Sequence, residues 1–186
     1  MTFNERGLIR AMKNAYREEG YSVAGTDYGY IITGEMWGVS IHDKAVPNTV
    51  KSLIVLHAGN LPDVGEAISV RKGETCVVIY EMAVDRIDSL SRLYHKNDRE
   101  IIRPTRLTID GYRLWQNPRT FAIKAIDPEN QQILDFTDNE AYLICDTLYD
   151  ETVYGSVFVH REVMEPEDLP MLAHLEQMQW IPVELG

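Results

Sequence analysis

Hydrophobic and polar residues alternate along much of the chain, most regularly between residues 101 and 136. Alternating runs flank Asp110-Gly111, a dipeptide that tolerates the positive φ angles of a type I′ turn. Asn117-Pro118 and the Asp-Pro-Glu-Asn segment at 127–130 then set off two further runs. The pattern predicts a β-meander over residues 101–136, whose first two strands form a hairpin.

A two-residue hairpin turn fixes the register of the strands that it joins, so the faces of this ribbon follow from the sequence. Ile109 is expected opposite Tyr112, and every pair further along follows in step as far as Arg106 and Trp115. The predicted core face consists of Leu107, Ile109, Tyr112 and Leu114. The opposite face, with Arg106, Thr108, Arg113 and Trp115, is predicted to be a cationic surface with an exposed indole.

Apolar residues recur at helical spacing in five segments of the chain. Two of these begin at an apparent capping box, Thr2 with Glu5 and Thr137 with Glu140. Glycines at 20 and 59 are expected to end the first two helices. The predicted helices are residues 3–19, a helix from Pro47 to Gly59, a short helix opened by Asp85 and Asp88, residues 138–149 and residues 166–178.

Alternation also predicts strands outside the meander. Hairpins are expected at 28–42 and 66–82, and a single strand at 152–160. Residues 76–80 are apolar on both faces, which favours a central strand covered on both sides. Together these elements predict one α+β domain over residues 1–186, with a mainly antiparallel sheet and about five helices.

Composition bounds the classes of protein that fit. The chain has 45% hydrophobic and 25% charged residues, values typical of a globular protein, and no apolar run long enough to span a membrane. The first residues lack the apolar core of a signal peptide, so we expect a cytoplasmic protein. Cys76 and Cys145 form no C-x-x-C pair, and both are expected to be reduced and buried.

The net charge of −11 is unevenly distributed. Residues 127–186 carry 14 Asp and Glu against one Arg, a net of −13, which leaves +2 on residues 1–126. Within the latter, residues 86–124 carry nine basic and four acidic residues, a net of +5. A chain this acidic is not expected to bind nucleic acid directly, because phosphate contacts dominate such binding.

Candidate catalytic residues each have a simpler structural explanation. Cys145, Asp146 and His160 are the residue types of a nucleophile, an orienting acid and a base, but Cys145 falls on the apolar face of its predicted helix. His42-Asp43 and His57 lack the spacing of a metal motif, so neither a metal site nor a cofactor is expected. Many carboxylates stand at predicted helix starts, where the helix dipole favours them.

The leading hypothesis is therefore a non-enzymatic interaction or regulatory domain. Its predicted partner-binding residues are Arg106, Arg113, Trp115 and Arg119, because arginine and tryptophan are enriched at interface hot spots. The partner would be another protein or a second copy of the chain, unless the acidic C-terminal part covers this face.

One alternative is a carboxylate-based hydrolase, with or without a divalent metal; another is an acidic mimic of DNA. Carboxylates that converge in a deep pocket would favour the hydrolase, and a flat acidic face the mimic.

Overall fold

The structure, a computed structural model, describes residues 3–78, 82–134, 141–160 and 169–180. Its strands form one sheet in the order β5-β4-β1-β2-β3-β11-β10-β9-β6-β7-β8, in which neighbouring strands pair antiparallel. The predicted α+β class is thus confirmed. The elements are α1 Glu5–Arg17, β1 Tyr21–Thr26, β2 Gly29–Thr33, β3 Trp37–His42, η1 Asp43–Ala45, α2 Asn48–Ala58, β4 Ala67–Arg71, β5 Glu74–Val78, α3 Met82–His95, β6 Glu100–Ile109, β7 Tyr112–Gln116, β8 Ile123–Ile126, α4 Pro128–Gln131, β9 Ala141–Ile144, β10 Thr147–Thr152, β11 Gly155–His160 and α5 Leu169–Leu175.

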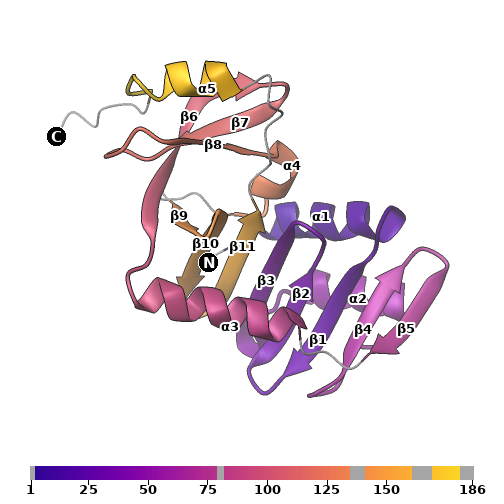
Figure 1. The fold of residues 1–186 in the computed structure, drawn as a ribbon. Helices are drawn as coiled ribbons and strands as arrows, with labels where there is room; N and C mark the ends of the chain where they lie inside the picture. Colours follow the sequence, from indigo (N-terminus) through magenta and orange to yellow (C-terminus); the bar gives the residue numbers. More distant parts are fainter. Residues whose placement is uncertain (1–2, 79–81, 135–140, 161–168, 181–186) are drawn as a thin grey trace.

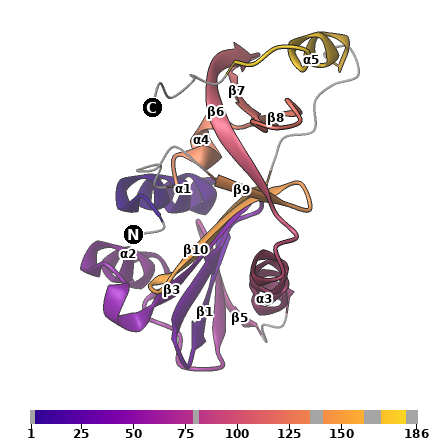
Figure 2. The ribbon, with the colours of Figure 1, turned by 90° about the vertical axis from the view of Figure 1, so that its left-hand side faces the viewer.

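Helices cover both faces of the larger part of the sheet. Helices α1 and α2 lie on one face and α3 lies on the other (Figures 1 and 2). The α1–α2 face packs the main core, which includes Val23, Ile32 and Val39. The α3 face packs a smaller core around Tyr149 and Phe158. No helix in the described parts of the chain is long and apolar enough to cross a bilayer.

The first helix is capped by a different residue from the one predicted. The Asn4 side chain accepts hydrogen bonds from the backbone N–H groups of Arg6 and Gly7, at 3.0 and 3.2 Å, and α1 begins at Glu5. Thr2, the predicted cap, lies outside the described residues. Strand β1, which follows α1 directly, was not predicted, because its adjacent residues Val23 and Ala24 are buried on opposite faces and break the alternation.

Three of the simpler predictions hold. The hairpins at 28–42 and 66–82 appear as β2–β3 and β4–β5, and α2 ends at Gly59 with a φ of 88°. The predicted short helix is longer, since α3 runs from Met82 to His95. The prediction of a central strand at 76–80 is wrong for residues 76–78, the part that the structure describes, because β5 stands at one edge of the sheet beside β4.

The ribbon follows its predicted register for only two pairs. Ile109 faces Tyr112 and Thr108 faces Arg113, but a β-bulge between Pro104 and Thr108 then shifts the pairing. Trp115 consequently faces Pro104 in place of Arg106.

The environment of Trp115 also differs from the prediction. Its side chain is 0% exposed in the main core, and its Nε1 donates a hydrogen bond of 3.1 Å to Oε1 of Gln131. The predicted Arg106–Trp115 pair is wrong because the bulge shifts the register, and the predicted exposure of the indole is wrong because the main core and Gln131 of α4 cover that face of β7.

The last third of the chain differs most from the predictions. Residues 141–149, predicted as part of a helix, form strands β9 and β10 around a tight turn at Cys145-Asp146. Cys145 is exposed, so its predicted burial is also wrong. The predicted third strand of the meander is present as β8, whereas the predicted fourth strand, which starts at Gln131, begins instead at the end of α4, whose N-cap is Asp127. The second predicted capping box, at 137–140, lies outside the described residues, as does the Cys76 side chain.

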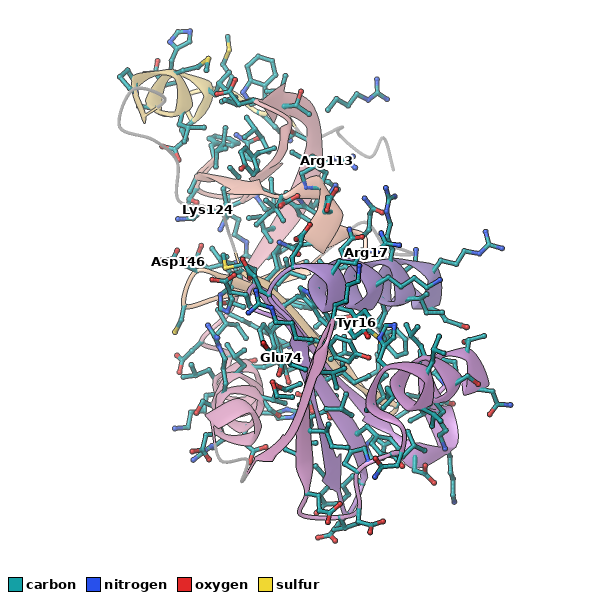
Figure 3. The ribbon with its side chains drawn as sticks, turned by 90° about the vertical axis from the view of Figure 1, so that its right-hand side faces the viewer. Tyr16, Arg17, Glu74, Arg113, Lys124 and Asp146 are labelled. Carbon is teal, nitrogen blue, oxygen red and sulfur yellow. The ribbon has the colours of Figure 1, made fainter. Side chains whose placement is uncertain are left out.

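Strand β6 joins the large body of the fold to a smaller second body. Residues 100–102 pair with β9, whereas residues 103–109 pair with β7, so β6 spans both bodies (Figure 1). Strands β6–β8 and α5 enclose a third core, with Ile109, Leu114 and Leu172. The Lys124 Nζ of β8 and the Asp146 carboxylate of the β9–β10 turn lie 3.4 Å apart (Figure 3). This ion pair adds a second contact between the two bodies.

Candidate functional site: an arginine pocket where the two bodies meet

The four predicted partner-binding residues do not share one surface. Arg106 is exposed on β6, and Arg113 is half-buried, with its Nε donating to the backbone oxygen of Thr105 at 3.1 Å. Trp115 is in the core. Arg119 is exposed in the loop between β7 and β8 and belongs to neither strand of the ribbon that carries Arg106 and Arg113.

Arg119 instead lines a cavity of about 250 Å³ at the junction of the two bodies. Its wall comes from three places in the fold: the segment that enters β6, the loop after β7, and β9. The lining residues are Asn97, Arg99, Ile101, Asn117, Pro118, Arg119 and Tyr142. Two guanidinium groups, two amides and three apolar or aromatic side chains thus meet in one hollow, and no carboxylate appears among the described residues that line it.

Arg99 packs against two tyrosine rings. Its guanidinium carbon lies 3.8 Å from the ring centroid of Tyr94, on α3, and 4.4 Å from that of Tyr142, on β9. The two rings meet edge to face with their centroids 5.3 Å apart. Such cation–π contacts fix the orientation of the guanidinium and offset part of its loss of hydration.

The Arg99 guanidinium also retains unused hydrogen-bonding capacity. Its Nη1 is buried and has no hydrogen-bond partner among the described residues. A buried donor without an acceptor costs free energy, so such an atom marks a place where a partner group would bind favourably. The N–H groups of a guanidinium lie in its own plane, and a carboxylate or phosphate binds from within that plane.

The loop that carries Arg119 is fixed by Asn117. The Asn117 Oδ1 accepts hydrogen bonds from the backbone N–H groups of Arg119 and Thr120, at 2.8 and 3.1 Å. Its Nδ2 donates to the Glu100 carboxylate at 3.0 Å. These bonds hold the Arg119 backbone at the rim of the cavity and bind Glu100 to an amide, while the Arg119 side chain extends into solvent.

Sequence reasoning found Arg119 but missed Arg99. Tyr94, Arg99 and Tyr142 belong to three elements, and nothing in their spacing indicates that they stack. The Asn117-Pro118 turn was the one local signal near the pocket, and it correctly predicted a break between strands.

A second hollow gathers carboxylates, as the hydrolase alternative requires. Two adjoining cavities of about 230 and 450 Å³ share Glu19, Gly20 and Glu35, and the first is also lined by Glu18, Asp127 and Glu129. A hydrogen bond with Glu35 and the charge of Glu35 raise the pKa of Glu19. However, Glu19 and Glu35 are both fully or largely solvent-exposed, and Arg10, Asn14 and Asn130 interrupt the acidic lining.

The predicted Cys145, Asp146 and His160 grouping does not form a catalytic arrangement. Cys145 and Asp146 form the β9–β10 turn, while the His160 Nδ1 lies 2.9 Å from Oγ1 of Thr147. Burial, and to a lesser extent the charge of Arg86, lower the pKa of His160 to about 4. His160 is therefore neutral at physiological pH and engaged with Thr147.

A serine, a histidine and a glutamate do meet beneath α3. Glu151 accepts hydrogen bonds from Ser91 Oγ at 2.8 Å and from Tyr149 OH at 2.7 Å, and His95 Nε2 lies 3.3 Å from its other oxygen. Because Ser91 donates to the carboxylate and not to His95, no base is placed to activate the serine. The group is a polar anchor that joins α3 to β10.

The remaining predicted metal candidates are accounted for structurally. His57 stacks on Tyr16 with centroids 3.8 Å apart, and its Nδ1 lies 2.9 Å from the Tyr21 hydroxyl. Within residues 3–78, 82–134, 141–160 and 169–180, no three His, Cys, Asp or Glu residues are grouped so that they could hold a metal ion.

Comparisons of the chain with protein-family models, with curated proteins and with solved structures find no significant match. The geometry of the pocket is thus the basis for proposing a function.

Proposed function

We propose that the chain is a non-enzymatic interaction domain that binds an anionic group of a partner protein in the Arg99–Arg119 pocket. One observation carries the proposal: the Arg99 guanidinium is fixed against the rings of Tyr94 and Tyr142 and keeps a buried Nη1 without a hydrogen-bond partner among the described residues. A guanidinium that is already oriented loses little conformational entropy when it binds an anion.

The composition of the pocket supports an anionic ligand. Arg119 adds a second positive charge, and the described lining contains no carboxylate to neutralise either arginine. The electrostatic attraction would be stronger here than on an open surface, because the cavity walls exclude part of the water. The site lies where two bodies of the fold meet, a common position for binding sites.

The proposed site differs in its residues from the partner site predicted from the sequence. Arg119 remains a binding residue, and Arg99 and Tyr142 join it. Arg106 and Arg113 stay available as secondary contacts on the ribbon, whereas Trp115 acts only through the core.

A titration with a short glutamate-rich peptide tests the proposal directly. Nuclear magnetic resonance of the arginine side-chain N–H groups would follow Arg99 and Arg119 individually while affinity is measured from the same spectra. Arg99→Gln and Arg119→Gln should each weaken binding at least about fivefold, the loss of roughly 1 kcal/mol. Arg92→Gln removes the same charge from an exposed position outside the pocket and is the matched control. Equal affinity in all three variants would refute the proposal.

A carboxylate-based hydrolase is the second candidate, and one observation favours it. Glu19 follows α1 and Glu35 lies in the β2–β3 turn, and a hydrogen bond between them raises the pKa of Glu19, the direction required of a general acid. We expect Glu19→Gln and Glu35→Gln to abolish any hydrolysis of aryl glycosides or aryl phosphates, with Glu74→Gln, an exposed position outside both cavities, as control. Retained turnover in both variants would eliminate this site.

The third candidate, an acidic mimic of DNA, has only charge in its favour. It relies on the net −13 of residues 127–186. Eight of the 14 acidic residues in that part lie outside the described residues, so no surface can be assigned to it.

A further inference from the structure

We infer that the anion bound by the Arg99–Arg119 pocket is a phosphomonoester on an aromatic side chain of the partner, that is, a phosphotyrosine. The inference rests on the proposed function, since it specifies the ligand of the same site. Three features of the pocket carry it: its two guanidinium groups, its apolar wall and its size.

The number of charges favours a dianion. A carboxylate carries one negative charge and two acceptor oxygens, whereas a phosphomonoester carries close to two charges near neutral pH and presents three acceptor oxygens. Arg99, Arg119 and the amide of Asn97 supply more donors and more positive charge than one carboxylate can use. Clusters of arginines are a general solution for binding phosphorylated side chains.

The apolar lining indicates what carries the phosphate. Ile101, Pro118 and the ring of Tyr142 form part of the same wall as the two arginines. A free phosphate ion would leave these surfaces in contact with water, whereas a phenyl ring attached to the phosphate would cover them. Burial of apolar surface adds about 25 cal/mol per Å², so the ring would contribute to affinity and not merely be tolerated.

The size of the cavity limits the ligand to about one side chain. At about 250 Å³ it falls just below the roughly 300–1,000 Å³ range of pockets that enclose whole drug-sized molecules. It exceeds what a phosphate group alone requires. A nucleotide, with a base and a sugar besides its phosphate, would extend well beyond the lining residues.

The experiment compares small probes that separate charge from ring. Phenyl phosphate, inorganic phosphate and benzoate are titrated into the full chain, and dissociation constants are obtained by calorimetry. We expect phenyl phosphate to bind at least about tenfold more tightly than either inorganic phosphate or benzoate, because only it engages both arginines and the apolar wall. Equal affinity for benzoate and phenyl phosphate would leave the anion-binding function standing and overturn the phosphate inference.

The pH dependence provides a second readout. The second ionisation of a phosphomonoester has a pKa near 6, so phenyl phosphate should bind more tightly as the pH rises from about 5 to about 7.5. Benzoate is already ionised across that range, and its affinity should stay nearly constant. A flat profile for phenyl phosphate would show that the second charge is not used.

Variants connect the probe to the pocket. Arg99→Gln should reduce the affinity for phenyl phosphate about 10- to 100-fold, the range for a lost charge-assisted hydrogen bond. Arg99→Lys keeps the charge but loses the planar fork, and should recover only part of this loss. Because Arg99 also packs against Tyr94 and Tyr142, Arg119→Gln provides an independent test at an exposed position, with Arg92→Gln as control.

Peptides complete the assignment. A peptide with phosphotyrosine should bind at least tenfold more tightly than its unphosphorylated form, and more tightly than the same peptide with phosphoserine. Tighter binding of adenosine monophosphate than of the phosphotyrosine peptide would overturn the inference in favour of a nucleotide. If neither these peptides nor the glutamate-rich peptide binds, the proposed function fails as well.

Discussion

The burial of Trp115 leads to a strong prediction about stability. Its side chain is fully buried, and its Nε1 donates to Oε1 of Gln131, a side chain that is itself only 8% exposed. Trp115→Ala removes the largest side chain type from a close-packed core, which costs about 3–5 kcal/mol. Since domains of this kind have total stabilities of about 5–15 kcal/mol, the variant should lose a large share of its free energy of unfolding.

A second substitution separates packing from hydrogen bonding. Trp115→Phe keeps an aromatic ring but removes the donor, which leaves the Gln131 oxygen buried without its partner at a cost of about 1–3 kcal/mol in addition to the lost volume. Gln131→Met in the Trp115→Phe background removes the unsatisfied acceptor and should restore part of that loss. Trp180→Phe, which breaks a bond from a half-buried indole to the Leu175 oxygen, is the matched control and should cost less.

Urea denaturation followed by circular dichroism measures these differences as shifts in the midpoint at constant slope. A Trp115→Ala variant within about 1 kcal/mol of the unsubstituted protein would refute the buried position and revive the exposed indole of the unbulged ribbon. The same result bears on binding studies. Because we expect Trp115→Ala to destabilise the fold, it cannot serve as a test of partner binding, whereas Arg119→Gln can.

Two further predictions concern the polar groups beneath α3. Tyr149→Phe should lower the free energy of unfolding by about 1–3 kcal/mol in urea denaturation, because Glu151 loses a hydrogen bond from a fully buried tyrosine. An unchanged free energy of unfolding would contradict the anchoring role of Glu151. His160 has a folded-state pKa of about 4, below its ordinary value of 6.5, so the unfolded chain binds the proton more readily. Its contribution to stability is therefore complete above about pH 6.5 and is lost as the pH falls towards 4. In His160→Gln, the free energy of unfolding should depend less on pH between about 6.5 and 4. An unchanged pH dependence in this variant would contradict the lowered pKa of His160.

The elements that depend on a few neighbouring residues in the sequence were predicted correctly. The Asp110-Gly111 turn fixed two cross-strand pairs correctly, and the apolar periodicity placed α1 and α2. The predicted register fails at the bulge, where the Thr105 side chain takes the place of backbone hydrogen bonds between β6 and β7. Its Oγ1 donates a hydrogen bond to the Leu114 oxygen and accepts one from the Leu107 N–H. The preceding residue, Pro104, has no N–H to donate. No periodicity rule anticipates such a bulge.

The candidate site was harder to predict for a different reason. Arg119 stood out as a basic residue beside a turn, but its partner Arg99 acquires its role from Tyr94 and Tyr142. These contacts exist only once α3, β6 and β9 have come together. The sequence could thus indicate a basic region at 86–124 but not the pocket that two of its arginines form.

The largest error, a helix at residues 138–149, arose because one pattern fits two structures. Ala141, Ile144 and Leu148 are buried, and they are spaced by three and four residues, as on a helix. In the structure they lie on two strands, since the chain reverses at Cys145 and Asp146 with φ angles of 47° and 64°. Both residues adopt the left-handed conformation of a type I′ turn without a glycine, so the usual sequence signal was missing.

Substitutions at Cys145 distinguish the two structures by the sign of their effect. In the observed turn, Cys145 has a positive φ, which costs a residue with a Cβ about 1–2 kcal/mol, and Cys145→Gly removes this cost. Glycine also gives the unfolded chain more conformational freedom, which lowers the free energy of unfolding by about 0.5–1 kcal/mol. The expected net result is a gain of about 0.5–1 kcal/mol in the free energy of unfolding, while Cys145→Ala keeps the Cβ and should gain nothing. In a helix the order would be reversed, because alanine is the best helix former and glycine costs about 1 kcal/mol relative to it. Since Cys145 is exposed, neither change disturbs the core. The free energies of unfolding of the two variants in urea therefore report on the backbone conformation at this turn. A more stable alanine variant would show that the chain does not reverse at Cys145-Asp146.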